Sequence, residues 1–229
     1  MRRPYLLTLC CSVTLTANSF AAQGQEADKL HHNASVVSAA RMLDVRSGRM
    51  LENVRILIED GRIKQVAHGK DAFVPAAGIA RHDLGDVTLL PGLIDMHVHI
   101  DSDPTFSGYS YLQFNDRFWS AVSVTHAQKT LMAGFTTIRN LGSDDWNDVG
   151  LQQAIDEGKV VGPRIVPAAY AFGATGGHCD STYFPPSMND RNLYNADNPE
   201  EARKSVREVR KYGAQVIKIC ATGGVFSRN

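Results

Sequence analysis

Short apolar segments alternate with helical ones from residue 91 onward, and this alternation constrains the fold more than any other feature of the chain. Helical length and spacing occur in residues 117–133, in "WNDVGLQQAIDEG" and in residues 199–212. The strand-like segments are "LIDMHVHI", "TTIRNLG", "RIVPAAYAFG" and "QVIKICATGG". Strands that alternate with helices form βα units on a parallel sheet. The sequence therefore predicts an α/β fold with four such units. In barrels built this way, the loops at the carboxyl ends of the strands form the active site.

Residues 35–90 carry a different signal. Short β-branched runs such as "NVRILIED" and "GRIKQVAHG" are separated by turn sequences. Asp60-Gly61 lies between these two runs and is a strong hairpin signal. We predict a small antiparallel sheet module ahead of the α/β region.

The N-terminus has the order of regions found in a secretory signal peptide. Arg2 and Arg3 precede an apolar stretch over residues 5–17, and the small-residue sequence "ANSFAAQ" follows. The apolar stretch is shorter than the ~20 residues that a membrane-spanning helix needs. We therefore predict a signal peptide over residues 1–21, cleavage after Ala21, and an exported protein, periplasmic or secreted.

Removal of that segment leaves two cysteines, Cys179 and Cys220. Two cysteines in a chain of this length do not make a disulfide framework, even in an oxidising compartment. The sequence favours two separate, partly buried thiols.

The charge balance narrows the class of partner. The chain holds 24 Lys and Arg residues against 24 Asp and Glu residues, so its formal net charge is zero. Proteins that bind nucleic acid or anionic membrane surfaces carry a basic excess. We therefore expect neither nucleic acid nor a membrane as a partner.

His97 and His99 flank Val98 in the first strand of the α/β region. Side chains two apart on a strand share a face, so both imidazoles and Asp95 point to the same side. Two imidazoles near the open end of a strand suit a divalent metal such as zinc. A His-x-His pair by itself is also compatible with hydrogen-bonded core histidines.

The sequence "LLPGLIDMHVHI", which contains this pair, resembles the signature of the amidohydrolase superfamily. The sequences similar to one branch of it are "TTIRNLG", "GATGGHCD" and "VIKICATGGVFS". That branch contains Xaa-Pro dipeptidase-like, Xaa-Arg/Lys carboxypeptidase and imidazolonepropionase-like enzymes, and the resemblance covers residues 35–229. It implies a metal-dependent hydrolase site on a TIM-type (β/α)8 barrel, of which residues 91–229 would form the N-terminal half. Residues 22–90 would be part of an antiparallel β-sandwich module.

Lys218 interrupts an apolar run, Val216 to Cys220, that is typical of a strand covered on both faces. Strand parity turns Lys218 and Cys220 inward, where burial disfavours the ammonium form and leaves a nucleophilic amine. By resemblance to the superfamily branch, Lys218 would be carboxylated to N6-carboxylysine. It would then bridge two divalent metal ions, of the zinc type, that His97 and His99 also bind. The alternative is a lysine that extends to the strand end to reach water.

His178 follows the glycines of "GATGGHCD". By resemblance it lies near the metals, where it would polarise the scissile carbonyl or stabilise the oxyanion of the tetrahedral intermediate. The alternative is that the glycines form a tight turn and His178 has no functional role in it. Arg139 and Asn140, in the second strand of the region, are expected to have supporting or structural roles.

The resemblance implies an enzyme that hydrolyses carbon–nitrogen bonds by attack of a metal-bound hydroxide on a carbonyl carbon. A small peptide, either a dipeptide or an N-acyl amino acid, is the expected substrate, and a cyclic amide is the alternative.

The superfamily also uses two histidines from the fifth and sixth strands and an aspartate from the eighth, which the four units do not include. We therefore expect the chain to be inactive alone, either as a truncated, non-catalytic fragment or as half of a split enzyme. The corresponding partners would be further copies in a homo-oligomer of the full-length protein or a complementing C-terminal half.

Overall fold

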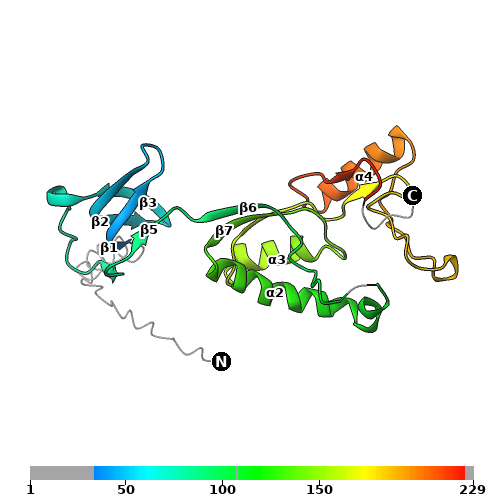
Figure 1. The fold of residues 1–229 in the computed structure, drawn as a ribbon, viewed down its shortest axis with the longest axis horizontal. Helices are drawn as coiled ribbons and strands as arrows, with labels where there is room; N and C mark the ends of the chain where they lie inside the picture. Colours follow the sequence, from blue (N-terminus) through cyan, green and yellow to red (C-terminus); the bar gives the residue numbers. More distant parts are fainter. Residues whose placement is uncertain (1–33, 107, 225–229) are drawn as a thin grey trace, which may run out of the picture. The chain divides into compact units, whose positions relative to one another are not determined.

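The computed structural model describes residues 34–106 and 108–224, so the predicted signal peptide lies outside the described residues. The chain divides into two compact units, one ending at Pro91 and the other beginning at Gly92. Figure 1 shows strands β1 to β5 in the first unit, and the α-helices with the remaining strands in the second. No helix in the described part of the chain is long and apolar enough to span a membrane.

The first unit contains one five-stranded sheet with the strand order β3-β2-β1-β4, in which β5 also pairs with β1. Its elements are β1 (Ala34–Asp44), β2 (Arg49–Glu59), β3 (Arg62–Ala67), η1 (Gly69–Asp71), β4 (Ala80–Asp83) and β5 (Thr88–Leu89). The buried apolar side chains are Val36, Ala39, Val54 and Ala67. Within residues 34–91 the strands form one sheet rather than the two packed sheets of a sandwich.

The predicted hairpin at Asp60-Gly61 is confirmed. Both residues have positive φ, 51° and 69°, and they join β2 to β3 in antiparallel orientation, as expected for a two-residue type I′ turn. The prediction of a purely antiparallel module is wrong, because β4 and β5 both pair with β1 in parallel. Residues 68–79 carry the chain from β3 at one edge of the sheet to β4 at the other. After this crossing, β4 runs parallel to β1.

The second unit begins with a parallel sheet whose order, β6-β7-β8, follows the chain. Its strands alternate with helices: β6 (Leu93–Val98), α2 (Asp116–Met132), β7 (Phe135–Asn140), α3 (Asn147–Asp156) and β8 (Arg164–Pro167). Figure 1 shows α2 and α3 on the same side of this sheet. Ile138 and Ile165 of the sheet are buried together with Ala127 of α2 and Leu151 of α3. The predicted βα alternation is confirmed over this region.

Asparagine residues cap the two long helices of the second unit. The side chain of Asn115 accepts the backbone N–H of Arg117 at the start of α2. Asn198 accepts the N–H of Glu201 at the start of α4 (Pro199–Lys211), which has proline at its first position. Short 3-10 helices, η2 (Gly108–Gln113) and η3 (Pro186–Met188), lie in the loops ahead of α2 and α4.

The third predicted strand is bent into two pieces, β8 and β9 (Phe172–Gly173). Ala169 between them has φ 55°, a left-handed conformation that an extended strand excludes. After α4 the chain forms β10 (Ile219–Cys220), which pairs with β9 in parallel. The expectation of one continuous parallel sheet is therefore wrong, since β9 and β10 form a separate two-stranded sheet.

Hydrogen bonds outside the regular ladders still hold the fourth predicted strand beside the third. The backbone N–H of Gln215 donates to the carbonyl of Pro167 at 2.8 Å, and that of Phe172 donates to the carbonyl of Lys218 at 3.2 Å. The strands thus follow the order expected of successive barrel strands. The predicted α/β class is confirmed. The sheets of the described residues remain open and do not close into a barrel.

Candidate active site

His97 lies near the carboxyl end of β6, and His99 follows directly after the strand. The centroids of their rings are 5.5 Å apart, and the ring planes are tilted by 58°. The backbone N–H of His97 donates to Oδ1 of Asp95 at 3.0 Å, so this carboxylate is engaged with the backbone beside the pair. The structure therefore brings the two predicted metal-binding histidines together at the end of a strand.

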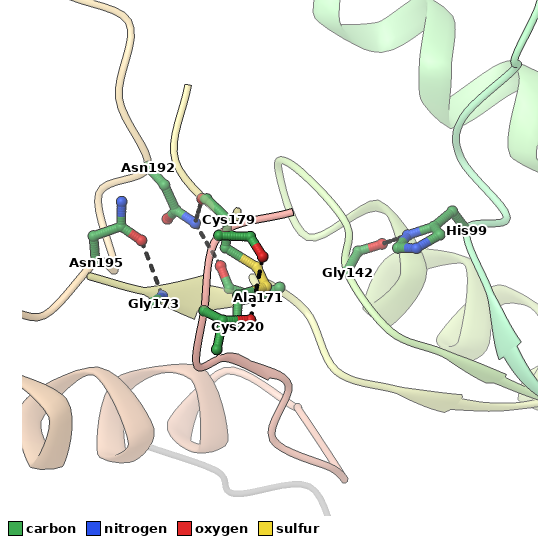
Figure 2. Close-up of a disulfide and its surroundings, with 10 residues drawn as sticks. His99, Gly142, Ala171, Gly173, Cys179, Asn192, Asn195 and Cys220 are labelled. Atoms are coloured by element: carbon green, nitrogen blue, oxygen red, sulfur yellow. Dashed lines mark hydrogen bonds between the residues drawn. A yellow bond between two sulfur atoms is a disulfide. The ribbon is translucent and has the colours of Figure 1, made fainter. Parts of the chain in front are cut away.

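A backbone carbonyl orients the ring of His99 (Figure 2). Nδ1 of His99 lies 3.2 Å from the carbonyl oxygen of Gly142. When Nδ1 donates to this oxygen, Nε2 is the nitrogen left to bind a metal. Gly142 has φ 139°, and a Cβ there would lie 3.3 Å from Cε1 of His99, so both conformation and space favour glycine in this loop.

Asn140, the last residue of β7, holds the chain around His99. Its Oδ1 accepts the backbone N–H of Ile100 at 2.7 Å. Its Nδ2 donates to the carbonyl of Gly142 at 3.0 Å and to Oδ2 of Asp148 at 3.1 Å. Asn140 is fully buried, so these contacts give it the structural role expected from the sequence.

Residues 174–180 form the first part of the loop after β9, and we call this part the His178 turn. Gly176 has φ 76°, a conformation that suits glycine in a tight turn. The backbone N–H of His178 reaches the carbonyl of Thr222 at 3.4 Å. A Cβ on Gly224 would overlap the ring of His178, so the imidazole packs directly on the backbone that follows β10. His178 thus has a defined place on a glycine turn.

His99 and His178 line the same cavity, which has a volume of about 310 Å³. Its other lining residues include Tyr111, Asp144, Tyr170 and Asn192. Two residues predicted from separate motifs therefore face one space at the carboxyl ends of β6 and β9. The lining residues do not include His97 or Lys218.

Lys218 directly precedes β10, and it is half-buried rather than buried as the apolar run predicts. Its positive charge acts on His97. The pKa of His97 is lowered first by loss of solvent around the ring and then by the positive charges of Lys218, His99 and Arg139, while Asp95 opposes them. The structure therefore places Lys218 within electrostatic reach of the proposed metal-binding pair.

The described residues contain no group of three or more His, Cys, Asp or Glu side chains arranged to hold a metal ion. His97 and His99 supply two nitrogen donors, whereas protein zinc sites use three or four ligands. The pair therefore fits a divalent metal as part of a larger ligand set.

Carboxylates beside the cavity are functional candidates that the motifs do not indicate. Asp144 lines the cavity with its side chain still in contact with solvent, and partial loss of solvent, followed by the charges of Asp101, Asp145 and Asp190, raises its pKa to about 6. Burial also raises the pKa of Asp101, although the hydroxyl of Ser143 donates to it at 2.7 Å. The sequence feature that could have indicated these carboxylates is the acidic run "SDDWND" directly after β7, because residues at the carboxyl end of a barrel strand face the active site.

The aromatic residues Tyr111 and Tyr170 line the cavity. Tyr111 stacks on Trp119 of α2, with ring centroids 4.3 Å apart, and burial raises the pKa of Tyr111 above its usual value. Tyr109 contacts Phe184 edge to face, which joins the loop after β6 to the loop after β9. Walls of this kind suit the apolar part of a small ligand.

Cys179 and Cys220 form a disulfide, with Cα atoms 5.7 Å apart (Figure 2). The expectation of two separate thiols is therefore wrong. The parallel pairing of Gly173 with Cys220 sets β10 beside β9, and the His178 turn brings Cys179 back to the end of β10. Sequence spacing does not reveal the bond, because only the pairing of these two short strands brings the cysteines together.

Comparison with known proteins places the chain in a family. Residues 88–228 match the Amidohydrolase family. Ochratoxinase from Aspergillus niger is 30% identical over 211 residues, which are 83% of this chain and 42% of the relative. An imidazolonepropionase from Cereibacter sphaeroides is 32% identical over 98 residues, which are 42% of this chain and 23% of the relative.

Solved structures agree with these matches. A Xaa-Pro dipeptidase with methionine bound in its active site has a TM-score of 0.73 at 30% identity, over 85% of this chain and 48% of that one. A prolidase complexed with N-methylphosphonate-L-proline has a TM-score of 0.71 at 30% identity, with the same coverage of both chains. The chain thus spans about half the length of these relatives. The resemblance inferred from the motifs is confirmed, and the chain belongs to the Amidohydrolase family.

Proposed function

We propose that the full-length protein is a metal-dependent enzyme that hydrolyses carbon–nitrogen bonds in dipeptides or N-acyl amino acids. The observation that carries this proposal is the cavity shared by His99 and His178, on a chain of the Amidohydrolase family. Among the relatives, a Xaa-Pro dipeptidase and a prolidase favour a dipeptide as the substrate.

We assign two divalent metal ions, with zinc as the metal, to a ligand set that includes His97, His99 and Lys218. Lys218 is proposed to bridge the two ions as N6-carboxylysine, because carboxylation replaces a cation with an anionic oxygen donor. When bound, such metals supply Lewis acidity, which polarises a carbonyl group and lowers the pKa of water at the site. The contact of His99 with the Gly142 carbonyl supports this assignment, since it leaves Nε2 for the metal.

The proposed role of His178 is to stabilise negative charge on the substrate. Its imidazole N–H donates a hydrogen bond to the carbonyl oxygen of the scissile amide, and this bond strengthens as charge develops on that oxygen. The packing of the ring on Gly224 restricts its position before substrate arrives, which favours such a preorganised donor.

A cyclic amide is the second candidate substrate, favoured by the match to an imidazolonepropionase. The same attack on a carbonyl carbon would then open a ring and leave the amine attached to the product. An assay that detects only a released amino acid would miss this reaction, so both product types have to be measured.

We also propose that the protein is exported and acts in the periplasm or outside the cell. The signal-peptide sequence of residues 1–21 supports this location. The Cys179–Cys220 disulfide supports it independently, because structural disulfides persist mainly in oxidising compartments.

The test is a substrate panel for the full-length protein that contains Xaa-Pro and other dipeptides, N-acyl amino acids and cyclic amides. Each substrate is assayed before and after removal of metal by a chelator. We expect hydrolysis of dipeptides or N-acyl amino acids that is lost on chelation and restored by zinc. Activity on cyclic amides alone would replace the first candidate with the second. Unchanged activity after verified metal removal would contradict the proposal.

A further inference from the structure

We propose that the Cys179–Cys220 disulfide is a positioning link, which fixes His178 relative to the strand segment that carries Lys218. Reduction of the disulfide would then lower turnover while the metals stay bound. This inference rests on the proposed hydrolase function and assigns to the two cysteines a part in it.

Each cysteine adjoins a residue of the proposed site. Cys179 directly follows His178 and itself lines the cavity that His178 shares with His99. Cys220 is buried and lies two residues after Lys218, the spacing at which side chains of an extended segment share a face. One covalent bond therefore connects the His178 turn to the segment that carries Lys218.

The other described connections between these segments are few and non-covalent: the contact of the His178 ring with Gly224 and hydrogen bonds of the backbone. β9 and β10 each contribute only two residues to their shared ladder. The hydrogen bond from the N–H of His178 to the carbonyl of Thr222 is long, at 3.4 Å. Asn192 donates to the carbonyl of Cys179 at 2.9 Å, but this bond ties the His178 turn to the loop ahead of α4 and not to β10. Within the described residues, the disulfide is thus the covalent connection between the turn and β10.

Loss of the disulfide would act mainly on His178. The ring packs on Gly224, and a turn released from Cys220 can withdraw the imidazole from that contact and from the cavity. A displacement of about 1 Å in a catalytic group can cost on the order of 100-fold in rate. His97 and His99 belong to the segment of β6, which the disulfide does not touch, and the segment of Lys218 keeps its own bond to β9, from the N–H of Phe172 to the carbonyl of Lys218 at 3.2 Å. The metals should therefore stay bound.

The experiment compares oxidised and reduced full-length protein. Tris(2-carboxyethyl)phosphine is the reductant, since dithiols bind zinc through their sulfurs. The phosphine supplies two electrons and takes the oxygen of one water molecule to become a phosphine oxide, while the two protons convert both sulfurs to thiols. The double variant Cys179→Ser/Cys220→Ser gives the same open state without a reductant, and its activity should not respond to the phosphine.

We expect alkylation and mass spectrometry to show Cys179 and Cys220 unmodified before reduction and modified after it. Reduction and the double variant should each lower kcat by about 10- to 100-fold with unchanged metal content and with KM within about threefold. In a His178→Ala background, loss of the disulfide should cost no further rate, because the residue that it positions is absent. Alkylation of both cysteines before reduction, or an equal loss of kcat in both backgrounds, would overturn the proposal.

A second readout does not depend on activity. Hydrogen exchange of the amides in residues 174–180 should become faster on reduction, while exchange in α2 stays unchanged. If the full-length protein hydrolyses none of the amides in the panel, the proposed function fails. Hydrogen exchange still tests whether the disulfide positions the His178 turn. Faster exchange confined to the turn would support this positioning, and unchanged exchange would refute it.

Discussion

Nδ2 of Asn140 donates a hydrogen bond to Oδ2 of Asp148 at 3.1 Å, and neither side chain is exposed to solvent. The same carboxylate oxygen accepts the backbone N–H of Ala169 at 3.0 Å, in the bend between β8 and β9. Oδ1 of Asn140 accepts the N–H of Ile100, next to His99. One buried pair therefore connects the ends of three strands and the start of α3 beneath the candidate site.

Asn140→Ala should lower the free energy of unfolding of the full-length protein by about 2–3 kcal/mol. The change leaves the carboxylate of Asp148 and the N–H of Ile100 each short of a buried partner. Urea unfolding measures the loss, and Gln128→Ala on the exposed face of α2 is the matched amide control, with an expected change below about 0.5 kcal/mol. A loss for Asn140→Ala no larger than for the control would show that the buried pair does not support the fold.

Asp144→Asn should raise the melting temperature at pH 8 and leave it unchanged at pH 4, measured in chelator-treated protein so that no bound cation alters nearby carboxylates. The pKa of Asp144 is raised from 3.8 to about 6 in the folded protein. The folded state therefore binds the proton of Asp144 more tightly than the unfolded state does. The resulting stabilisation is complete below about pH 4 and is lost as the pH rises through 6.

Asparagine stays neutral, so the variant avoids that loss. The rise should be small, roughly 1–2 °C, because solvent contact weakens the repulsion among the carboxylates. Asp156→Asn, at the exposed end of α3, is the control. A difference that is equally large at pH 4 would rule out ionisation of Asp144 as its cause.

Gly224→Ala should lower kcat of the full-length protein about 10-fold or more, because the added methyl group occupies the space of the His178 ring and displaces it. Gly150→Ala in α3 is the control, since a Cβ there meets no atom within 4 Å, and alanine favours the helix. Steady-state kinetics of both variants test this expectation. Normal kcat for Gly224→Ala would mean that the position of His178 does not matter for turnover.

Residues 22–229 expressed alone should associate or remain partly unfolded and should not hydrolyse amides. In the part of the chain that the structure describes, β6 is an edge strand of an open sheet, and Leu93, Ile94 and Met96 on it are each about half exposed. Unpaired edges with apolar side chains promote association. Size-exclusion chromatography and the substrate panel test this, and a soluble monomer with turnover would contradict it.

The βα alternation and the hairpin could be predicted because each rests on local signals. The spacing of apolar residues predicted the helices to within two residues of their observed ends, and the local sequence Asp60-Gly61 was sufficient to predict its turn. The clustering of His99 with His178 followed from the rule that barrel loops gather at the carboxyl ends of strands.

The remaining features depend on contacts between distant segments. The bend at Ala169 is stabilised by a hydrogen bond to Asp148 of α3. The local sequence does not predict the left-handed conformation of this alanine. The disulfide depends on the pairing of β9 with β10, and the parallel direction of β4 depends on the path of the connection before it. Periodicity within a segment carries none of this information.

The most direct test of the account is the metal content of the full-length protein with Lys218→Ala, measured by inductively coupled plasma mass spectrometry beside Lys204→Ala on the exposed surface of α4. We predict two metal ions per chain in the control variant and the loss of at least one in Lys218→Ala. Activity should fall with the metal and return in part when bicarbonate and a short-chain carboxylate replace the missing oxygen donors. Two bound metals and normal turnover in Lys218→Ala would contradict the assignment of Lys218 as a metal ligand.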